Sequence, residues 1–289
     1  MEKRIAFLAF LTVAMLLAAV VGLSSCQKKT VNSEVAPAAT QTGAQSAIPT
    51  IQPGVLIVGM EIGYPPMEYL DIDGKTPLGF DVEMGKIIAE RLGLKIEYVD
   101  TAWDGIFAGV DTGKYDCIMS AVTVTPERLA NYNFTKPYIG NAQALVLLKN
   151  TEITAKSPDE LGGLEVAYQA ETTTDIYMTK LAEDGLKFTP REYDKVLNCF
   201  DELRIGRVDA IVCDSLVAFD YIAPEDSPFE IVWQGTADET FGICLKKGND
   251  ALTAAIDKTL DSMFADGTML KISQDVFKMD MVSAARESK

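Results

Sequence analysis

The residues best suited to chemistry include a single arginine at the start of a predicted helix. Thr125, Pro126, Glu127 and Arg128 have the types expected at the N-cap and the first three helical positions. A positive charge in the first turn opposes the helix dipole, and an anion bound in front of the turn removes that conflict. The guanidinium can fork a carboxylate that the helix-start amides also meet. The alternative is a surface arginine paired with Glu127 or Asp81, and the residues alone leave both open.

A second candidate is Asp214, which directly follows the apolar run of residues 210–213. That run predicts a strand, and open α/β sheets bind ligands beyond the carboxyl ends of their strands. A carboxylate at this edge can bind a cationic group. The alternative is that Asp214 caps a helix beginning at Ser215, and the two roles can coexist.

The composition removes several classes of chemistry. The 289 residues contain no histidine, which excludes Ser-His and Cys-His nucleophilic catalysis, imidazole acid–base chemistry and His-rich metal sites. The five cysteines form no CxxC pair and lack zinc-ligand spacing, so we expect no metal, no cofactor and buried free thiols at the last four. The formal charge of −16 argues against nucleic acid as a partner and against docking to anionic lipid through a basic patch.

The N-terminus has the layout of a removable export signal. Lys3 and Arg4 precede an apolar run over residues 5–21, and small residues lead from there to Cys26. The run is nearly long enough to be a permanent transmembrane helix. However, the Leu-Ser-Ser-Cys sequence resembles a bacterial lipobox, which implies a signal peptide over residues 1–25 and a lipid on Cys26. Residues 26–52 are rich in small and polar types and predict a flexible tether.

Strand and helix patterns alternate along the rest of the chain, which predicts an α/β fold. Two similar lobes, one after the other, are the simplest arrangement of these patterns. The expected strands are residues 55–59, 95–99, 117–120, 165–169, 208–213 and 241–245. The expected helices are residues 80–92, 103–110, 175–184, 195–205 and 250–264, one beyond Thr268, and one that begins with a capping box at Ser157.

Four sequence stretches together resemble the family of periplasmic-type solute-binding proteins for polar amino acids, the partners of ABC importers. The stretches are GFDV at 79–82, TAWDG at 101–105, SAVTVTPER at 120–128 and VDAIVCD at 208–214. The resemblance runs from about residue 55 to residue 277. It implies a two-lobe periplasmic-binding-protein fold of type II, hinged by two crossing strands near residues 142–148 and 235–242. Lobe one would comprise residues 53–142 and 238–289, and lobe two residues 143–237.

The resemblance also implies a site for a zwitterion, which needs one cationic and one anionic anchor. Arg128 would bind the carboxylate of an amino acid and Asp214 its ammonium group. Further ligand-binding residues would be Thr123, Ala121, Thr172 and Thr173, although capping of helix starts is the commoner role of threonine. The family usually has glycine where this chain has Glu171.

Aromatic and acidic residues would shape the side-chain end of that site. By the resemblance, Tyr64 would form a platform and Trp103 an apolar wall, although either ring can be an ordinary core residue. Glu61 stands three residues before Tyr64, where binders of cationic amino acids often carry an acid.

The function implied by the resemblance is capture of a polar, and by Glu61 a cationic, amino acid outside the cytoplasmic membrane for delivery to an ABC permease. Asp214 would arrive from lobe two as the lobes close around the ligand. We expect a lipid-anchored monomer with no catalytic residues. The alternatives are an enzyme on the same fold that resembles cyclohexadienyl dehydratase, and a ligand sensor.

Overall fold

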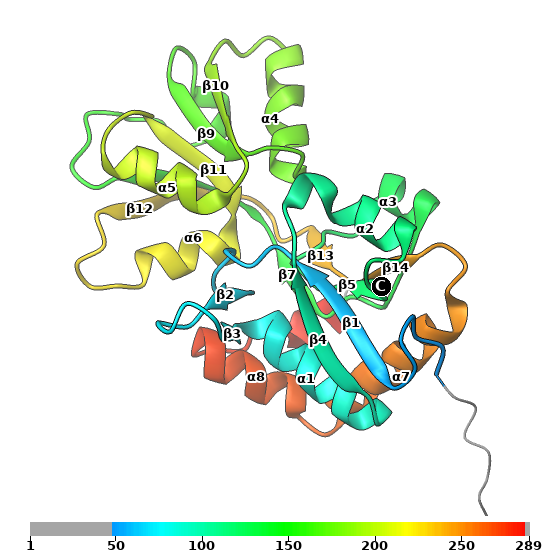
Figure 1. The fold of residues 1–289 in the computed structure, drawn as a ribbon. Coiled ribbons are helices and arrows are strands. Elements are labelled where there is room, and N and C mark those ends of the chain that lie inside the picture. Colours follow the sequence, from blue (N-terminus) through cyan, green and yellow to red (C-terminus); the bar gives the residue numbers. More distant parts are fainter. Residues whose placement is uncertain (1–47, 287–289) are drawn as a thin grey trace, which may run out of the picture. The chain divides into compact units, whose positions relative to one another are not determined.

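The computed structural model describes residues 48–286 (Figure 1). The signal peptide predicted over residues 1–25, the lipid predicted on Cys26 and most of the tether predicted over residues 26–52 lie outside these described residues. Within residues 48–286, no helix is long and apolar enough to cross a membrane.

The first sheet has five strands in the order β4-β1-β5-β14-β6. Its strands are β1 (Val55–Met60), β4 (Lys95–Asp100), β5 (Cys117–Ile118), β6 (Tyr132–Phe134) and β14 (Cys244–Lys246). Strands β4 and β5 run parallel to β1, whereas β14 lies antiparallel between β5 and β6. A strand from the last part of the chain thus completes a sheet that begins at residue 55, and the expectation of two consecutive lobes is wrong.

The second sheet also has five strands, in the order β10-β9-β11-β8-β12. Its strands are β8 (Gln143–Leu148), β9 (Glu165–Gln169), β10 (Thr189–Tyr193), β11 (Ala210–Asp214) and β12 (Phe229–Gln234). Between the two sheets lies a two-stranded pair of β7 (Ile139–Asn141) and β13 (Glu239–Phe241). The chain therefore passes from β7 into β8 through Ala142 and returns from β12 to β13 through residues 235–238.

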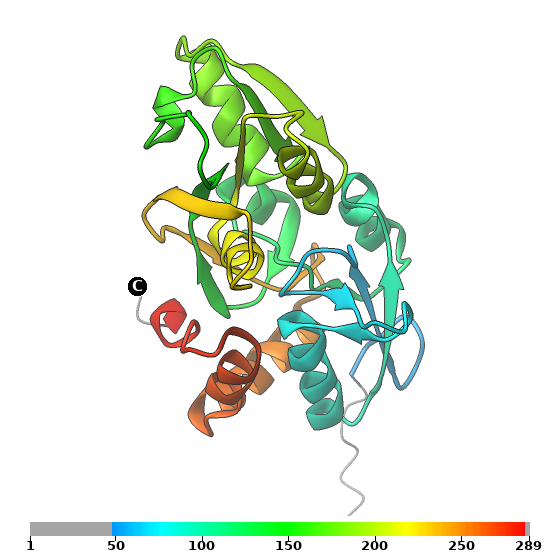
Figure 2. The ribbon, with the colours of Figure 1, turned by 90° about the vertical axis from the view of Figure 1, so that its left-hand side faces the viewer.

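Helices cover both faces of each sheet. Around the first sheet are α1 (Phe80–Leu92), α2 (Ile106–Thr112), α3 (Pro126–Asn131), α7 (Asp250–Ala265) and α8 (Thr268–Phe277). Around the second are α4 (Thr173–Glu183), α5 (Val196–Arg204) and α6 (Ser215–Ile222). Short elements complete the chain: the hairpin β2 (Tyr69–Leu70) with β3 (Pro77–Leu78), and the 3-10 turns η1 (Trp103–Gly105), η2 (Pro158–Glu160) and η3 (Ser283–Arg286). Helices α1, α7 and α8 lie side by side (Figures 1 and 2).

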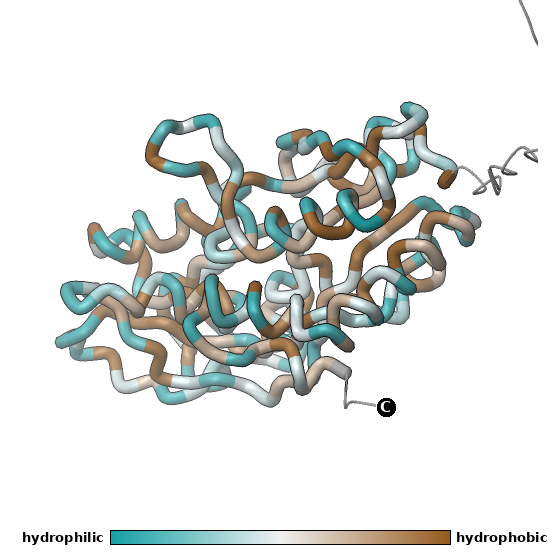
Figure 3. The backbone as a smooth tube through the Cα atoms, turned by 90° about the horizontal axis from the view of Figure 1, so that it is seen from below, coloured by the Kyte–Doolittle hydropathy of each residue, from teal (hydrophilic) through white to brown (hydrophobic). Residues whose placement is uncertain are grey.

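The period of two along the strands explains why helices are needed on both faces. In β1, Leu56, Val58 and Met60 join the core beneath α1, α7 and α8, whereas Ile57 packs on the opposite side with α2. In β8, alternate residues divide in the same way between two cores. Both strands are therefore mainly apolar, because helices cover both faces of the sheets to which they belong. Figure 3 shows the complementary alternation of hydrophobic and hydrophilic residues along the helices.

The structure corrects two predicted elements. The predicted helix at Ser157 is a single 3-10 turn without a side-chain cap, because the Glu160 carboxylate accepts from the Lys156 amide and Gly163 then turns the chain at φ 83°. The strand predicted over residues 241–245 is interrupted at Gly242. The part before Gly242 pairs with β7, and the part after it pairs with β5 and β6. The predicted strand is therefore divided between two sheets.

Gly79 offers a test of how the first helix is positioned. It precedes α1 with φ 122°, and a Cβ atom there would lie 2.2 Å from the Met67 carbonyl oxygen. Both the clash and the backbone conformation exclude an L side chain. We expect Gly79→Ala to lower the free energy of unfolding by about 3 kcal/mol or more, measured by urea denaturation. Gly74→Ala, at φ 66° on the hairpin with open space around it, should cost about 1 kcal/mol. Equal losses would contradict this assignment.

Candidate ligand-binding site

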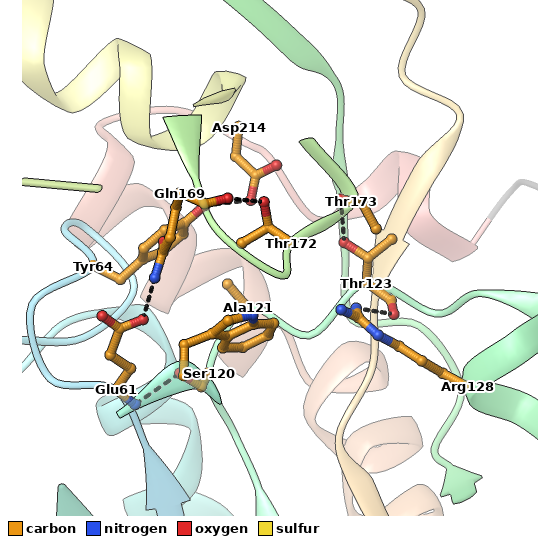
Figure 4. Close-up of a pocket in the computed structure, with 11 residues that line it drawn as sticks. Glu61, Tyr64, Ser120, Ala121, Thr123, Arg128, Gln169, Thr172, Thr173 and Asp214 are labelled. Carbon is orange, nitrogen blue, oxygen red and sulfur yellow. Dashed lines mark hydrogen bonds between the residues drawn. The ribbon is translucent and has the colours of Figure 1, made fainter. Parts of the chain in front are cut away.

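One pocket gathers side chains from the ends of both sheets (Figure 4). Its lining includes every ligand-binding residue predicted from the sequence: Glu61, Tyr64, Trp103, Ala121, Thr123, Arg128, Thr172, Thr173 and Asp214. Ser120 and Gln169 line it as well.

Arg128 lies at the start of α3 as the sequence predicted. Thr125 is the N-cap, and its side chain accepts from the Arg128 amide. The guanidinium donates to the Thr123 carbonyl at 2.9 Å and stacks over Trp103 and Phe107 at 5.5 and 5.0 Å. In the described part of the chain no ion pair within 4.0 Å involves Arg128, so the alternative of a surface pair is wrong.

This cation is partly buried and has no direct counter-ion among residues 48–286. Burial lowers the pKa of Arg128 from its ordinary value, and the negative charges of Asp214 and Glu239 partly oppose that effect. A guanidinium so placed binds an anion more strongly than one in bulk water. The geometry therefore favours a carboxylate in front of Arg128.

Asp214 ends β11 and turns its carboxylate into the pocket. Tyr64 donates to Oδ2 at 2.6 Å, and Asn141 and Gln143 donate to Oδ1 at 2.7 and 3.3 Å. Its side chain makes no capping bond to α6, although Asp214 is the residue at the N-cap position. Burial, followed by repulsion from Glu239, raises the pKa of Asp214 to about 7. A bound cation would therefore stabilise its ionised form.

The rings of Tyr64 and Trp103 each join the two lobes. Tyr64 follows β1 and reaches Asp214 at the end of β11. The Trp103 indole donates to the carbonyl of Glu171 at 3.0 Å, and Trp103 is 9% exposed. Glu171 has φ 59°, a left-handed conformation that glycine adopts at no steric cost. The loop thus keeps a glycine-like backbone in spite of the glutamate.

Glu61 and Gln169 form the other end of the pocket, opposite Arg128 (Figure 4). The Gln169 amide donates to Glu61 Oε2 at 2.7 Å and to the Asp194 carbonyl at 2.9 Å. Burial raises the pKa of Glu61 to about 7, although Lys195 acts in the opposite direction. Gln169 Oε1 is buried and has no hydrogen-bond partner in the part of the chain that the structure describes. An unsatisfied buried acceptor is costly, so this end of the pocket favours a ligand with donors.

The predicted threonines have mixed roles. The Thr172 hydroxyl caps α4 by accepting from the Asp175 amide and donates to the Gln169 carbonyl, as the capping alternative expects. Thr123 and Thr173 lie with their hydroxyl oxygens 3.5 Å apart. The ligand contacts predicted for all three remain predictions.

Several polar residues around the site were missed from sequence. Ser120 begins the stretch SAVTVTPER at residues 120–128 and could have been found from its place beside Ala121. Asn141, Gln143 and Glu239 surround Asp214 across segments distant in sequence, with Asn141 and Gln143 donating to both carboxylates. No local signal marks them. The four described cysteines are buried free thiols, and no cluster of metal-ligating residues occurs in residues 48–286.

Comparisons with known proteins point to one family. The sequence model of the bacterial extracellular solute-binding proteins, family 3, matches residues 56–279. The L-cystine-binding protein TcyJ of Escherichia coli K12 is 34% identical over 229 residues, which cover 79% of this chain and 84% of that protein. ABC transporter arginine-binding protein 1 of the same strain is 26% identical over 223 residues, covering 76% and 89%.

Solved structures agree in fold. An ancestral arginine-binding protein bound to arginine superposes with a TM-score of 0.74 at 35% identity, covering 78% of this chain and 98% of that one. The ancestral amino acid-binding protein AncCDT-1, a precursor of cyclohexadienyl dehydratase, gives 0.70 at 33% identity, covering 78% and 95%. The predicted two-lobe fold of type II is therefore confirmed.

Proposed function

Because the chain belongs to the bacterial extracellular solute-binding proteins of family 3, we propose that it binds one free amino acid and delivers it to an ABC importer. The observation that carries this proposal is the placement of Arg128 and Asp214 in one pocket. Arg128 has no counter-ion within the described residues and the pKa of Asp214 is raised, so a zwitterion would satisfy both groups. Binding needs no covalent step.

The far end of the pocket supports a cationic side chain. Glu61 offers a carboxylate and Gln169 an unpartnered carbonyl oxygen, and a guanidinium or ammonium tip donates to both. Lys195 lies close enough to Glu61 to lower its pKa, which places both signs of charge near this end. A second zwitterionic head, as in cystine, is therefore the second candidate.

Lobe closure is part of the proposal. Tyr64–Asp214, Trp103–Glu171 and Glu61–Gln169 all cross between the sheets. We propose that lobe one comprises residues 53–142 and 238–289, that lobe two comprises residues 143–237, and that the segments between them act as the hinge. Closure would exclude water and strengthen the charge pairs with the ligand.

Thermal shift of the purified protein would test the ligand class. The panel is the twenty amino acids with ornithine, citrulline and cystine, after copurified ligand is removed by unfolding and refolding. A micromolar ligand at millimolar concentration raises stability by about 4 kcal/mol. Shifts with arginine, lysine or ornithine support the cationic ligand, and a shift with cystine alone supports the second candidate. No shift together with turnover of prephenate or arogenate would replace the proposal with the dehydratase-like enzyme.

The pH dependence of affinity provides a separate check. Glu61 and Asp214 have pKa values of about 7 in the ligand-free site, and a bound cation lowers both. Binding therefore releases protons, and affinity for arginine should fall as the pH drops below about 7, by up to tenfold per unit for each group. Calorimetry from about pH 5.5 to 8.5 measures this, and Glu61→Gln should reduce the slope. An affinity independent of pH would contradict the assignment.

Anchoring is proposed from the N-terminal sequence. We propose that Cys26 becomes the first residue of a mature lipoprotein, held outside the cytoplasmic membrane as a monomer beside its permease. Mass spectrometry of the membrane-extracted protein should find the added lipid, and Cys26→Ala should abolish it. An unmodified Cys26 in the wild-type protein would overturn the anchor.

A further inference from the structure

Two fully buried carboxyl groups lie next to the pocket and bond to two consecutive residues that line it. Glu68 and Asp81 are both 0% exposed. The Ser120 hydroxyl donates to Glu68 Oε1 at 2.5 Å, and the Ala121 amide donates to Asp81 Oδ2 at 2.8 Å. The Tyr138 hydroxyl donates to the same Asp81 oxygen at 3.0 Å.

The remaining oxygen of each carboxyl group has no partner. Glu68 Oε2 and Asp81 Oδ1 are buried without a hydrogen bond from any residue of 48–286, as is Gln169 Oε1 in the ligand pocket. Two neighbouring carboxylates cannot both ionise in such an environment without a large cost. We propose that Glu68 and Asp81 share one proton, carried on Glu68 Oε2 and donated to Asp81 Oδ1. This single bond gives both oxygens a partner.

The surroundings explain which group keeps the proton. Asp81 accepts from two donors, which favours its ionised form, whereas Glu68 accepts from one. Burial, followed by the charge of Asp81, raises the pKa of Glu68 well above its ordinary value. The titratable groups that face the pair are Glu61, Tyr98 and Tyr138, and no cation of the described residues is among them.

The pair acts as a positioning element for the pocket. Ala121 has φ 48°, which is strained for a residue with a Cβ atom, and the bond to Asp81 holds it there. Ser120 Oγ, besides donating to Glu68, accepts from the Glu61 amide at 3.0 Å. The shared proton thus fixes Glu61, Ser120 and Ala121 together. Its effect on affinity rests on the proposed function, but its existence does not.

Infrared spectroscopy tests the proton without any ligand. At about pH 8.5, above the pKa values of about 7 at Glu61 and Asp214, the wild-type protein should show the carbonyl band of a buried protonated carboxyl group. The band should disappear in Glu68→Gln, shift or disappear in Asp81→Asn, and persist in the exposed control Glu225→Gln. A wild-type protein without the band, or a band unchanged in both variants, would overturn the proposal.

Ligand affinity then tests whether Glu68 acts as a hydrogen-bond donor or only fills space. In Glu68→Gln the amide donates in place of the proton and the carbonyl accepts from Ser120, so ligand affinity should stay within about threefold of wild type. Glu68→Met fills the space without either group and should weaken binding by about tenfold or more. Equal losses in the two variants would overturn the donor role. If no amino acid binds, the proposed function fails while the infrared result still decides the pair.

Discussion

Replacing Arg128 by alanine should weaken binding of the amino acid ligand by about 100-fold or more. The guanidinium is a partly buried cation with no ion pair in the described part of the chain, and in the complex it would carry the ligand carboxylate. Loss of one partner from a desolvated, charge-assisted pair leaves the other charge buried and unpaired. Isothermal titration calorimetry of the refolded protein measures the change.

Two further variants sharpen this result. Arg128→Lys keeps the charge but loses the planar fork and the stacking on Trp103 and Phe107, so it should recover only part of the affinity. Arg207→Ala removes an exposed arginine that pairs with Glu202 on lobe two, and it should bind as the wild type does. Wild-type affinity in Arg128→Ala would refute the assigned role.

Asp214→Asn should have two opposite effects. It keeps the shape of the side chain but removes the charge that would meet the ligand ammonium group, so affinity should fall by about 30-fold or more. The same change should stabilise the ligand-free protein. A carboxyl group whose pKa is raised on folding contributes stability below its ordinary pKa of 3.8 and loses it as the pH rises through about 7.

The ligand-free comparison therefore depends on pH. Above about pH 7 the ionised Asp214 destabilises the folded protein and asparagine does not, so Asp214→Asn should unfold at a higher temperature by an amount equivalent to about 1 kcal/mol or more. Below about pH 4 the advantage should vanish. Asp226→Asn, at an exposed position of lobe two, is the matched control. A variant with lower stability at high pH and unchanged affinity would contradict both parts.

Local signals in the sequence were sufficient for the parts of the site that depend on a few neighbouring residues. Thr125 caps α3 and places Arg128 in its first turn, as the residue types predicted. Asp214 stands at the end of a strand, as the apolar run before it indicated. Helices α1 and α5 also end within one residue of the positions expected from the sequence, just before glycines 93 and 206. Capping and periodicity act over a single turn or strand, so they can be read without knowledge of the fold.

Partners distant in the chain could not be predicted in this way. Tyr64 and Asp214 are 150 residues apart, Glu61 and Gln169 are 108 apart, and nothing near any of them specifies the other. The expected helix at Ser157 failed for a local reason, because the Glu160 carboxylate accepts from the Lys156 amide and the chain turns at Gly163 before further helical turns form.

The sequence by itself determined the α/β class, the type of most main elements, the exclusion of histidine chemistry and the local positions of Arg128 and Asp214 at a helix start and a strand end. The tertiary structure alone decided that Asn141, Gln143 and Glu239 surround Asp214 and that Glu68 and Asp81 are buried together. It also placed β14 in the first sheet, a return that the family resemblance implied but that the order of strand and helix patterns did not. The physical reason is that helix and strand preferences arise from neighbours along the chain. Strand order, burial and the pKa values of the carboxyl groups arise from contacts that form only when distant segments exclude water from the same space.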